Sequence, residues 1–216
     1  MMAKRNISVI IADDHPLILK GLFEELTAAG YNVVETATQG MEALELILTH
    51  KPNVALLDID MPLLTGFDVI KTAKEKGSKT KFIVLSFHKE SEYVAQAKAL
   101  QIQGYLLKED SFSEIEKCIQ AVIDDKTYFS SSFDSFSLQN ASDELRKLQL
   151  LTPSEATILK LIAQQTTTSE IAEMLSVSSR TVEKHRSNII AKLGLDQASN
   201  SLISWSLANK NIIAQL

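Results

Sequence analysis

The 216-residue sequence has little cysteine, little glycine or proline, and no long apolar run. Its single cysteine, Cys118, excludes a disulfide framework and a cysteine-based zinc site, and it fits a reducing compartment. The longest early apolar run, Ile7–Ala12, is followed directly by Asp13 and Asp14, so we expect neither a signal peptide nor a membrane span there. Seven glycines and four prolines exclude a collagen-like chain. The composition predicts a folded cytoplasmic protein with no membrane partner.

The sequence also lacks an excess of basic residues. It has 22 Lys and Arg against 27 Asp and Glu, a net charge of -5, and this average argues weakly against nucleic acid as a partner. The charge is uneven, however. Residues 148–216 carry six basic and five acidic side chains, whereas residues 1–147 carry 16 basic and 22 acidic ones. A change of sign along the chain suggests two domains with different partners.

Short apolar runs alternate with amphipathic stretches over the first 125 residues. Strands are expected at Ile7–Ala12, Asn32–Thr36, Val54–Asp58, Lys81–Leu85 and Gly104–Leu107. Helices are expected at Pro16–Ala28, Met41–Thr49, Phe67–Lys76, Glu92–Leu100 and Ser111–Asp124. The strict alternation predicts a doubly wound α/β domain, a five-stranded parallel sheet with helices on both faces. The last helix begins with Ser111-x-x-Glu114, the pattern of a capping box.

The composition and the periodicity of the sequence change after residue 125. Residues 126–147 are interpreted as a linker that is serine-rich and docked in part through Tyr128, Phe129 and Phe133. Residues 148–216 are predicted to form a small all-α domain of four helices. Its helices are expected after the capping box Thr152–Glu155, after the pair Thr167 and Glu170, from Ser179 to Leu193 and over Asn200–Leu207. A short helix, a tight turn and a longer helix form a helix-turn-helix.

Polar side chains follow four of the predicted strands. Asp13 and Asp14 end the first strand, Asp58 ends the third, Ser86 follows the fourth and Lys108 follows the fifth. The carboxyl ends of parallel strands lie along one edge of a sheet, so these side chains are expected to converge. Three carboxylates need a cation to stay ionised together, and oxygen ligands select a hard metal such as Mg²⁺. With a hydroxyl and an ammonium group nearby, the cluster is suited to accept a phosphoryl group on a carboxylate.

The third predicted helix of the C-terminal domain has two distinct faces. Val182, Ile189 and Leu193 recur at helical spacing and are expected to be buried. The outward positions are then Arg180, Glu183, Lys184, Ser187, Asn188 and Ala191. Arginine, lysine, asparagine and serine are the residue types that contact base edges and phosphates in a major groove of double-stranded DNA.

Residues 7–125 resemble the receiver domain of bacterial two-component response regulators, which has a flavodoxin-like fold. The matching stretches are IIADDHP at Ile10–Pro16, LLDIDMPLLTG at Leu56–Gly66, VLS at Val84–Ser86 and GYLLK at Gly104–Lys108. The resemblance implies that Asp58 is the phosphoacceptor and that a sensor histidine kinase is the donor. It implies that Asp13, Asp14, Asp58 and the backbone carbonyl of Asp60 hold Mg²⁺. It also implies that Ser86 and Tyr105 are switch residues and that Lys108 pairs with the phosphoryl group.

Residues 151–210 resemble the LuxR-type (NarL-like) helix-turn-helix, through LTPSEATILKLIA and EIAEMLSVSSRTVEKHRSNIIAKLGL. Its recognition helix would be Ser178–Leu193. The DNA-contacting residues implied are Arg180, Thr181, Glu183, Lys184, Arg186, Ser187, Asn188 and Lys192. Glu183 stands where that family often has lysine, and its carboxylate could accept a hydrogen bond from cytosine. The chain as a whole resembles a transcription factor that dimerises on phosphorylation and is not an enzyme.

Two other functions are compatible with parts of the pattern. Asp58-x-Asp60 also resembles the nucleophile motif of haloacid-dehalogenase-type phosphatases, which are Mg²⁺-dependent enzymes. That family places the motif on its first strand, whereas here it follows the third. The C-terminal domain could alternatively be an interaction module that does not bind DNA. The kinase, the stimulus, the target operons and the sign of regulation cannot be derived from the sequence.

Overall fold

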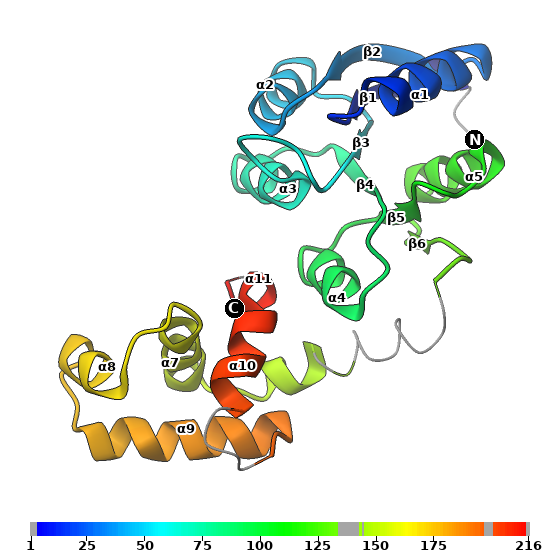
Figure 1. Cartoon of the computed structure of the whole chain (residues 1–216). Helices are drawn as coiled ribbons and strands as arrows, with labels where there is room; N and C mark the ends of the chain where they lie inside the picture. Colours follow the sequence, from blue (N-terminus) through cyan, green and yellow to red (C-terminus); the bar gives the residue numbers. More distant parts are fainter. Residues whose placement is uncertain (1–3, 134–142, 144, 197–200, 215–216) are drawn as a thin grey trace. The chain divides into compact units, whose positions relative to one another are not determined.

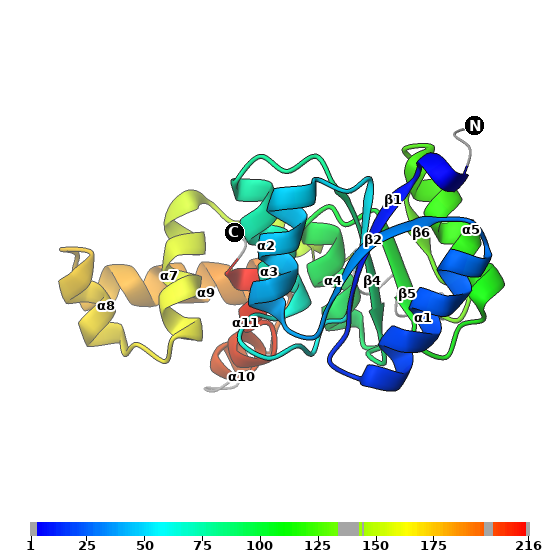
Figure 2. The ribbon, with the colours of Figure 1, turned by 90° about the horizontal axis from the view of Figure 1, so that it is seen from above.

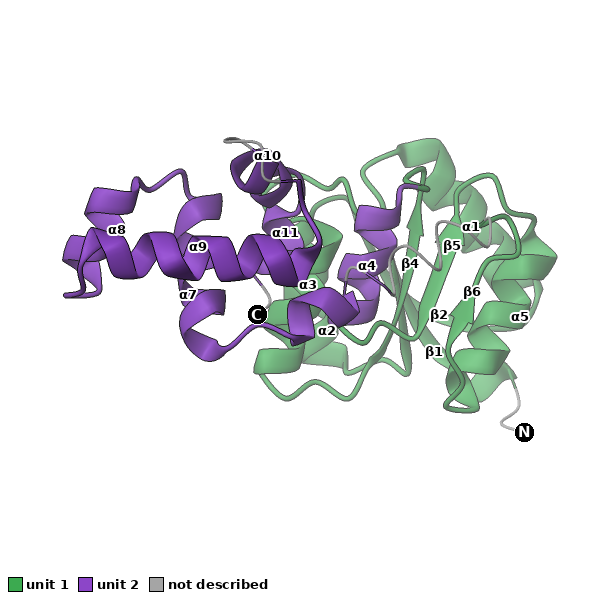
Figure 3. Ribbon diagram, turned by 90° about the horizontal axis from the view of Figure 1, so that it is seen from below, with its two compact units in different colours: residues 1–89, 100–134 green, residues 90–99, 135–216 purple. Residues whose placement is uncertain are grey.

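The computed structural model describes residues 4–133, 143, 145–196 and 201–214. The chain forms two compact units, one of residues 1–89 and 100–134 and one of residues 90–99 and 135–216 (Figure 3). The proposed domain limits of 1–125 and 148–216, with a linker at 126–147, stay a prediction. Within the described ranges, no helix is both long enough and apolar enough to cross a membrane.

The first unit is built on one parallel sheet. Its strands are β1 (Ser8–Ala12), β2 (Asn32–Ala37), β3 (Val54–Leu57), β4 (Lys81–Ser86), β5 (Gly104–Leu107) and β6 (Tyr128–Phe129). Their order is β2-β1-β3-β4-β5-β6, so β1 and β3 lie side by side, and the direction in which strands are added to the sheet reverses between them (Figure 1). The prediction of a five-stranded sheet was one strand short. The amide of Tyr128 donates to the Gln103 carbonyl, 2.8 Å away, so the serine-rich segment pairs with the otherwise open edge of β5.

Helices cover both faces of this sheet, as predicted. A short 3₁₀ turn η1 (Lys4–Asn6) precedes β1, and the helices are α1 (Pro16–Ala28), α2 (Gly40–His50), α3 (Gly66–Glu75) and α5 (Phe112–Ile123). Helix α4 (Ser91–Ala99) follows β4 in the sequence but belongs to the second compact unit. Helices α1 and α5 cover one face, and α2 and α3 cover the other (Figures 1 and 2). The core on the α1–α5 side joins alternate residues of the central strands, such as Val9, Leu56 and Ile83, to Cys118. The central strands are apolar throughout because both of their faces are buried.

The capping box predicted at the start of α5 is not formed. Ser111 is the N-cap residue, but its side chain accepts no capping hydrogen bond. The carboxylate of Glu114 instead accepts hydrogen bonds from the Tyr128 hydroxyl at 2.5 Å and the Ser131 hydroxyl at 3.2 Å. These contacts lower the pKa of Glu114, the hydrogen bond from Tyr128 contributing most. Glu114 therefore anchors the segment after α5 rather than the start of its own helix.

The second unit contains the helices predicted for the C-terminal domain. They are α7 (Pro153–Ala163), α8 (Thr168–Met174), α9 (Ser179–Leu193), α10 (Ser201–Ala208) and α11 (Lys210–Ile213), and residues 145–149 are also helical. Capping boxes form at Thr152 with Glu155 and at Thr167 with Glu170, as the sequence predicted. Gly194 ends α9 with a positive φ of 67°, which glycine adopts without a steric penalty. The prediction of four helices missed the short α11, and Asn200 lies outside the described residues.

Candidate functional site

The strand ends of the first unit converge at the carboxyl edge of the sheet. The Asp58 amide donates to the Ala12 carbonyl at 2.8 Å, and the Lys108 amide donates to the Ser86 carbonyl at 2.9 Å. These bonds continue the β1–β3 and β4–β5 ladders by one residue. Residues far apart in the sequence are thereby fixed side by side, because the register of the sheet leaves them no other position.

Lys108 lies between two buried carboxylates. Its Nζ is 2.9 Å from Asp13 Oδ2 and 2.8 Å from Asp58 Oδ2, and all three side chains are 1–2 % exposed. Burial raises the pKa of Asp58, and the charge of Asp13 adds to this effect, while Lys108 opposes it. Burial disfavours the charged lysine, yet the two carboxylates outweigh burial and raise the pKa of Lys108. One ammonium group thus faces two carboxylates. When all three groups are ionised, the cluster has a net charge of −1.

The chemistry of the donor set fits a divalent cation. Asp13, Asp14, His15 and Asp58 each offer one ligand atom, and these atoms all lie within 4.8 Å of one another. The acid pair and Asp58 supply carboxylate oxygens, which are the ligands that Mg²⁺ prefers. His15 is the N-cap residue of α1, and its Nδ1 lies 2.8 Å from Asp14 Oδ1 and 3.1 Å from Asp13 Oδ1.

Ser86 and Tyr105 are both fully buried, but only Ser86 lies at the carboxyl edge. The Ser86 Oγ accepts a hydrogen bond from the His88 amide at 3.2 Å. The Tyr105 hydroxyl donates a hydrogen bond to the His88 carbonyl at 3.1 Å, which links Tyr105 to the loop after β4. The same loop also contacts Asp60, because His88 Nε2 lies 2.7 Å from Asp60 Oδ2. Sequence reasoning did not identify His88, and no spacing rule points to it.

Gly66 explains part of the spacing after Asp58. A Cβ atom at this position would lie 2.1 Å from the backbone carbonyl oxygen of Asp58, which no side chain tolerates. The Gly66 amide donates to the Ile59 carbonyl at 2.9 Å and folds the loop back onto the end of β3. Thr65 and Asp68 then form a capping box that begins α3. A glycine here therefore allows the loop to close against Asp58.

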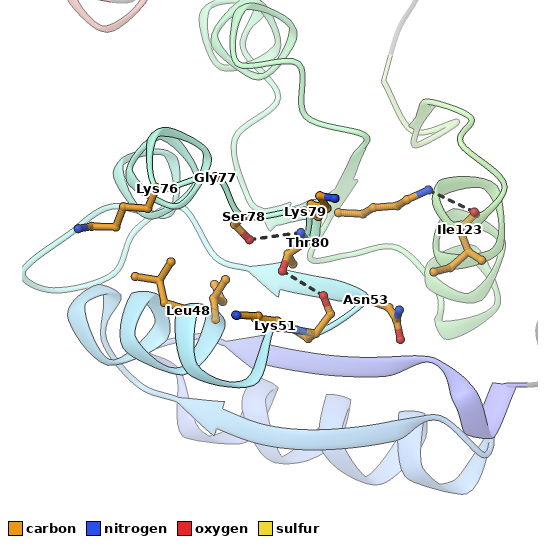
Figure 4. Close-up of a pocket in the computed structure, with 12 residues that line it drawn as sticks. Leu48, Lys51, Asn53, Lys76, Gly77, Ser78, Lys79, Thr80 and Ile123 are labelled. Carbon is orange, nitrogen blue, oxygen red and sulfur yellow. Dashed lines mark hydrogen bonds between the residues drawn. The ribbon is translucent and has the colours of Figure 1, made fainter.

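A groove of about 610 Å³ lies elsewhere in the first unit. It is lined by the end of α2, the loop between α2 and β3, and the loop between α3 and β4 (Figure 4). This is the amino edge of the sheet, opposite to the edge where parallel sheets hold their sites. Lysines line it, but Lys81 Nζ already contacts the carbonyls of Val122 and Ile123 at the end of α5. The positive charge of Lys81 therefore complements the partial negative charge at the C-terminus of α5.

Helix α9 of the second unit has the two faces that its sequence predicts. Val182, Ile189 and Leu193 are 0–1 % exposed and pack toward α7 and α8. The residues classed as exposed on α9 include all those predicted to face outward, namely Arg180, Glu183, Lys184, Ser187, Asn188 and Ala191. Helices α8 and α9 are separated by a turn in which Ser176 has a φ of 53°. The geometry is that of a helix-turn-helix with a polar, partly basic outer face.

Five of the predicted DNA contacts, namely Thr181, Glu183, Arg186, Ser187 and Lys192, have partners within this unit. Glu183 Oε1 accepts a hydrogen bond from Thr168 Oγ1 at 2.9 Å, which ties α9 to the start of α8. Arg186 Nε lies 3.9 Å from Glu183 Oε2. Thr181 is bound to the N-cap residue Ser178, through its amide at 3.1 Å and its hydroxyl at 2.8 Å. These contacts hold the first half of α9 in place.

Lys192 is held more firmly than the other predicted contacts. Its Nζ lies 2.6 Å from Glu155 Oε2, and the Glu155 side chain is 4 % exposed. Burial opposes ionisation of Glu155, but Lys192 and the capping bonds from Thr152 lower its pKa to about 2. The pair joins the end of α9 to the start of α7. Lys192 therefore stabilises the helical unit, a role that the one-dimensional pattern did not reveal.

The chain is similar to two families of bacterial regulatory sequences. Residues 9–120 match the model of the response regulator receiver domain, and residues 149–203 match that of the bacterial regulatory proteins of the luxR family. The transcriptional regulatory protein MctR of Rhizobium johnstonii is 35 % identical over 96 % of both chains. The oxygen regulatory protein NreC of Staphylococcus aureus is 32 % identical over 94 % of this chain and 98 % of the relative.

Two solved structures of response regulators also match. RcsB from Salmonella enterica serovar Typhimurium, bound to promoter rprA in the presence of phosphomimetic BeF3-, is 25 % identical. That match covers 97 % of this chain and 99 % of RcsB, with a TM-score of 0.64. The signal receiver domain of the putative response regulator NarL from Mycobacterium tuberculosis is 36 % identical over 55 % of this chain, with a TM-score of 0.53.

Proposed function

On the premise that this chain belongs to the two-component response regulators with a receiver domain and a LuxR-type DNA-binding domain, we propose that Asp58 is its phosphoacceptor. The chain regulates transcription, as its family does. The proposal adds the site, the cofactor and the partners. The observation that carries it is the convergence of Asp13, Asp58 and Lys108 in a buried cluster at one sheet edge. A sensor histidine kinase is the proposed donor, and the proposed location is the cytoplasm.

The residues of the site divide the work of phosphoryl transfer. A carboxylate oxygen of Asp58 forms the new bond to phosphorus, while the P–N bond to the donor histidine breaks and its electron pair stays on the imidazole. Lys108, already 2.8 Å from Asp58, neutralises charge on the transferred oxygens. The Ser86 hydroxyl donates a hydrogen bond to one of the phosphoryl oxygens. Asp13, Asp14, Asp58 and the Asp60 carbonyl would hold Mg²⁺, which supplies the remaining positive charge.

The output is proposed to be sequence-specific binding of double-stranded DNA by α9. Arg180, Lys184, Ser187 and Asn188 are the best candidates for base and phosphate contacts, since they are exposed on one face. Phosphorylation would favour a homodimer, and a dimer reads paired half-sites. Glu183 contributes an acceptor to this face that is held by Thr168.

The phosphatase alternative is not favoured by any comparison. The second aspartate of its motif would be Asp60, whose carboxylate is 62 % exposed and is 2.7 Å from His88 Nε2. The motif also follows β3, after an acid pair on β1, rather than the first strand. A module without DNA binding is disfavoured by the luxR-family match over residues 149–203.

Labelling with a small phosphodonor tests the proposal. In the presence of Mg²⁺, the wild-type chain should acquire acid-labile phosphate and then bind promoter DNA more tightly. Asp58→Ala should abolish the label, whereas Asp60→Asn should retain it because only the backbone carbonyl of residue 60 is needed. Label on Asp58→Ala would refute the assignment. Continuous hydrolysis of a generic phosphate ester that is lost in Asp60→Asn would instead establish the phosphatase.

A further inference from the structure

The segment that leaves α5 is fixed to the edge of the sheet by backbone and side-chain bonds. The Ser130 amide donates to the Tyr105 carbonyl at 2.8 Å, next to the bond from Tyr128 to Gln103. Ser132 Oγ donates to Asp110 Oδ1 at 2.7 Å. Together with the two bonds to Glu114, these contacts dock residues 128–133 onto β5 and the start of α5. A plain connecting segment would not need so many specific contacts.

The docked segment buries the aromatic ring of Tyr105. Phe133 is 6 % exposed, and its ring centroid lies 5.0 Å from that of Tyr105 in an edge-to-face arrangement. Phe129 lies 6.2 Å from Tyr105 and 6.4 Å from Phe133, so the three rings form one cluster. Edge-to-face pairs at such distances are stabilising beyond the area that they bury. The position of Tyr105 therefore depends on whether this segment is docked.

A continuous series of contacts joins Tyr105 to the phosphoryl site. The Tyr105 hydroxyl donates to the His88 carbonyl at 3.1 Å, and the His88 amide donates to Ser86 Oγ at 3.2 Å. Turning Ser86 Oγ toward a phosphoryl group on Asp58 takes this acceptor away from the His88 amide. A shift of the loop in response would carry the His88 carbonyl with it and strain the hydrogen bond from the Tyr105 hydroxyl. Weakening a hydrogen bond to a buried hydroxyl costs free energy, which favours a matching shift of Tyr105.

We infer that Phe133, with Phe129, is a positioning residue that holds Tyr105 in the arrangement where Asp58 is paired directly with Lys108. Docking of residues 128–133 and phosphoryl occupancy of Asp58 are then coupled and oppose each other. Coupling between two sites is reciprocal, so loosening the segment must favour occupancy by the same factor that occupancy loosens the segment. The inference rests on the proposed function of Asp58. It makes the first residues of the connection to the output domain part of the switch.

Binding of beryllofluoride in the presence of Mg²⁺ to the full chain tests this coupling. Phe133→Ala should lower the apparent Kd by about five-fold or more, the lower range of allosteric coupling. Phe133→Leu, which keeps an apolar side chain, should fall between the alanine variant and the wild type. Ile123→Ala is the matched control, because it removes apolar volume at the amino edge of the sheet, away from the Tyr105 ring cluster. Its Kd should stay within about two-fold of the wild type.

Amide hydrogen exchange of the wild type supplies a readout that needs no variant. Beryllofluoride should speed the exchange of the Tyr128 and Ser130 amides by a factor similar to the gain in affinity of Phe133→Ala. Unchanged exchange at these amides, together with wild-type affinity in both Phe133 variants, would overturn the inference and leave the proposed function intact. A wild-type chain that binds no beryllofluoride would overturn the proposed function, and the inference with it.

Discussion

The two units of this chain keep their functional side chains in opposite environments. In the first unit, Asp13, Asp58 and Lys108 are 1–2 % exposed and are fixed by strand register. In the second unit, the candidate DNA contacts are exposed on one face of α9, and buried residues elsewhere hold that face in place. Buried charges interact strongly and are suited to chemistry, whereas exposed charges are weakly coupled and are suited to reading a surface.

The largest effect is expected where the buried charges lose their counter-charge. Lys108→Ala leaves two buried carboxylates without an ammonium group, which should lower the free energy of unfolding by about 3 kcal/mol. Millimolar Mg²⁺ should restore part of this loss, because the cation takes over the neutralisation. Lys89→Ala is the matched control, since the Lys89–Glu109 pair is about half exposed. It should cost less than about 1 kcal/mol. Urea denaturation measures both losses of unfolding free energy. Equal losses in Lys108→Ala and Lys89→Ala would contradict the proposed difference between buried and exposed charges.

The second unit contains a partly buried ion pair between Glu155 and Lys192. Glu155→Gln removes the charge that binds Lys192, and it should destabilise the helical unit by about 2 kcal/mol. Because the folded pKa is lowered from 4.5 to about 2, the contribution of Glu155 is present above pH 4.5 and is lost as the pH falls through about 2. Urea denaturation followed by Trp205 fluorescence reports on this unit. Glu173→Gln, on an exposed residue, should leave the midpoint unchanged, and a similar loss there would disprove a specific role for the pair.

Asp58→Asn should stabilise the first unit, by less than the Glu155 pair stabilises the second. The folded pKa of Asp58 is raised above its ordinary value of 3.8, so ionised Asp58 weakens the folded state at neutral pH. The advantage of asparagine should be absent below pH 3.8 and should develop as the pH rises through the folded pKa. Thermal denaturation at several pH values would show this. If Asp58→Asn instead destabilised the first unit at neutral pH, the attraction between Asp58 and Lys108 would be stronger than the cost of burying the Asp58 charge.

The smallest effect is expected on the exposed face of α9. Lys184→Ala should weaken DNA binding uniformly across sequences and should reduce the slope of log K against log salt by about 0.9, the value for one phosphate contact. Lys160→Ala, on α7, should not change the slope. The midpoint of Trp205-monitored unfolding should be the same in both variants. If Lys184→Ala leaves the slope unchanged, α9 does not contact the DNA backbone at this position.

Much of this organisation could be predicted from residues alone. Apolar runs ending in Asp13, Asp58 and Ser86 specified strands, and parallel topology brought their ends together without knowledge of any contact. The exposed face of α9 followed from the spacing of Val182, Ile189 and Leu193. Such predictions succeed because they depend on periodicity, which is a local property of the chain.

The features that were missed depend on contacts between distant segments. Docking of Tyr128 and Phe129 was predicted, but their pairing as strand β6 was not. The strand has only two residues and forms because β5 has an open edge, so the sequence of the segment does not predict it. Glu114 has the spacing of a capping residue, yet Tyr128 and Ser131 compete for its carboxylate. Lys192 has the position of a DNA contact, yet Glu155 binds it. In each case the outcome depends on a partner that the one-dimensional spacing does not identify.

The net charge of -5 was a poor guide for the same reason. It averages residues 1–147, which include the buried carboxylates, with residues 148–216, in which four of the six basic residues lie on α9. Neither partner could be derived from the average. The division of the sequence at residue 148 was needed to expose the difference.

Selection of bound genomic DNA by the full chain tests the central claim most directly, which is that chemistry at Asp58 controls reading by α9. The account predicts that phosphorylated wild type enriches a defined set of sites with paired half-sites, and that the unphosphorylated chain and Asp58→Ala enrich the same sites far more weakly. An identical yield and identical sites with and without phosphorylation, or no enrichment in either state, would contradict it.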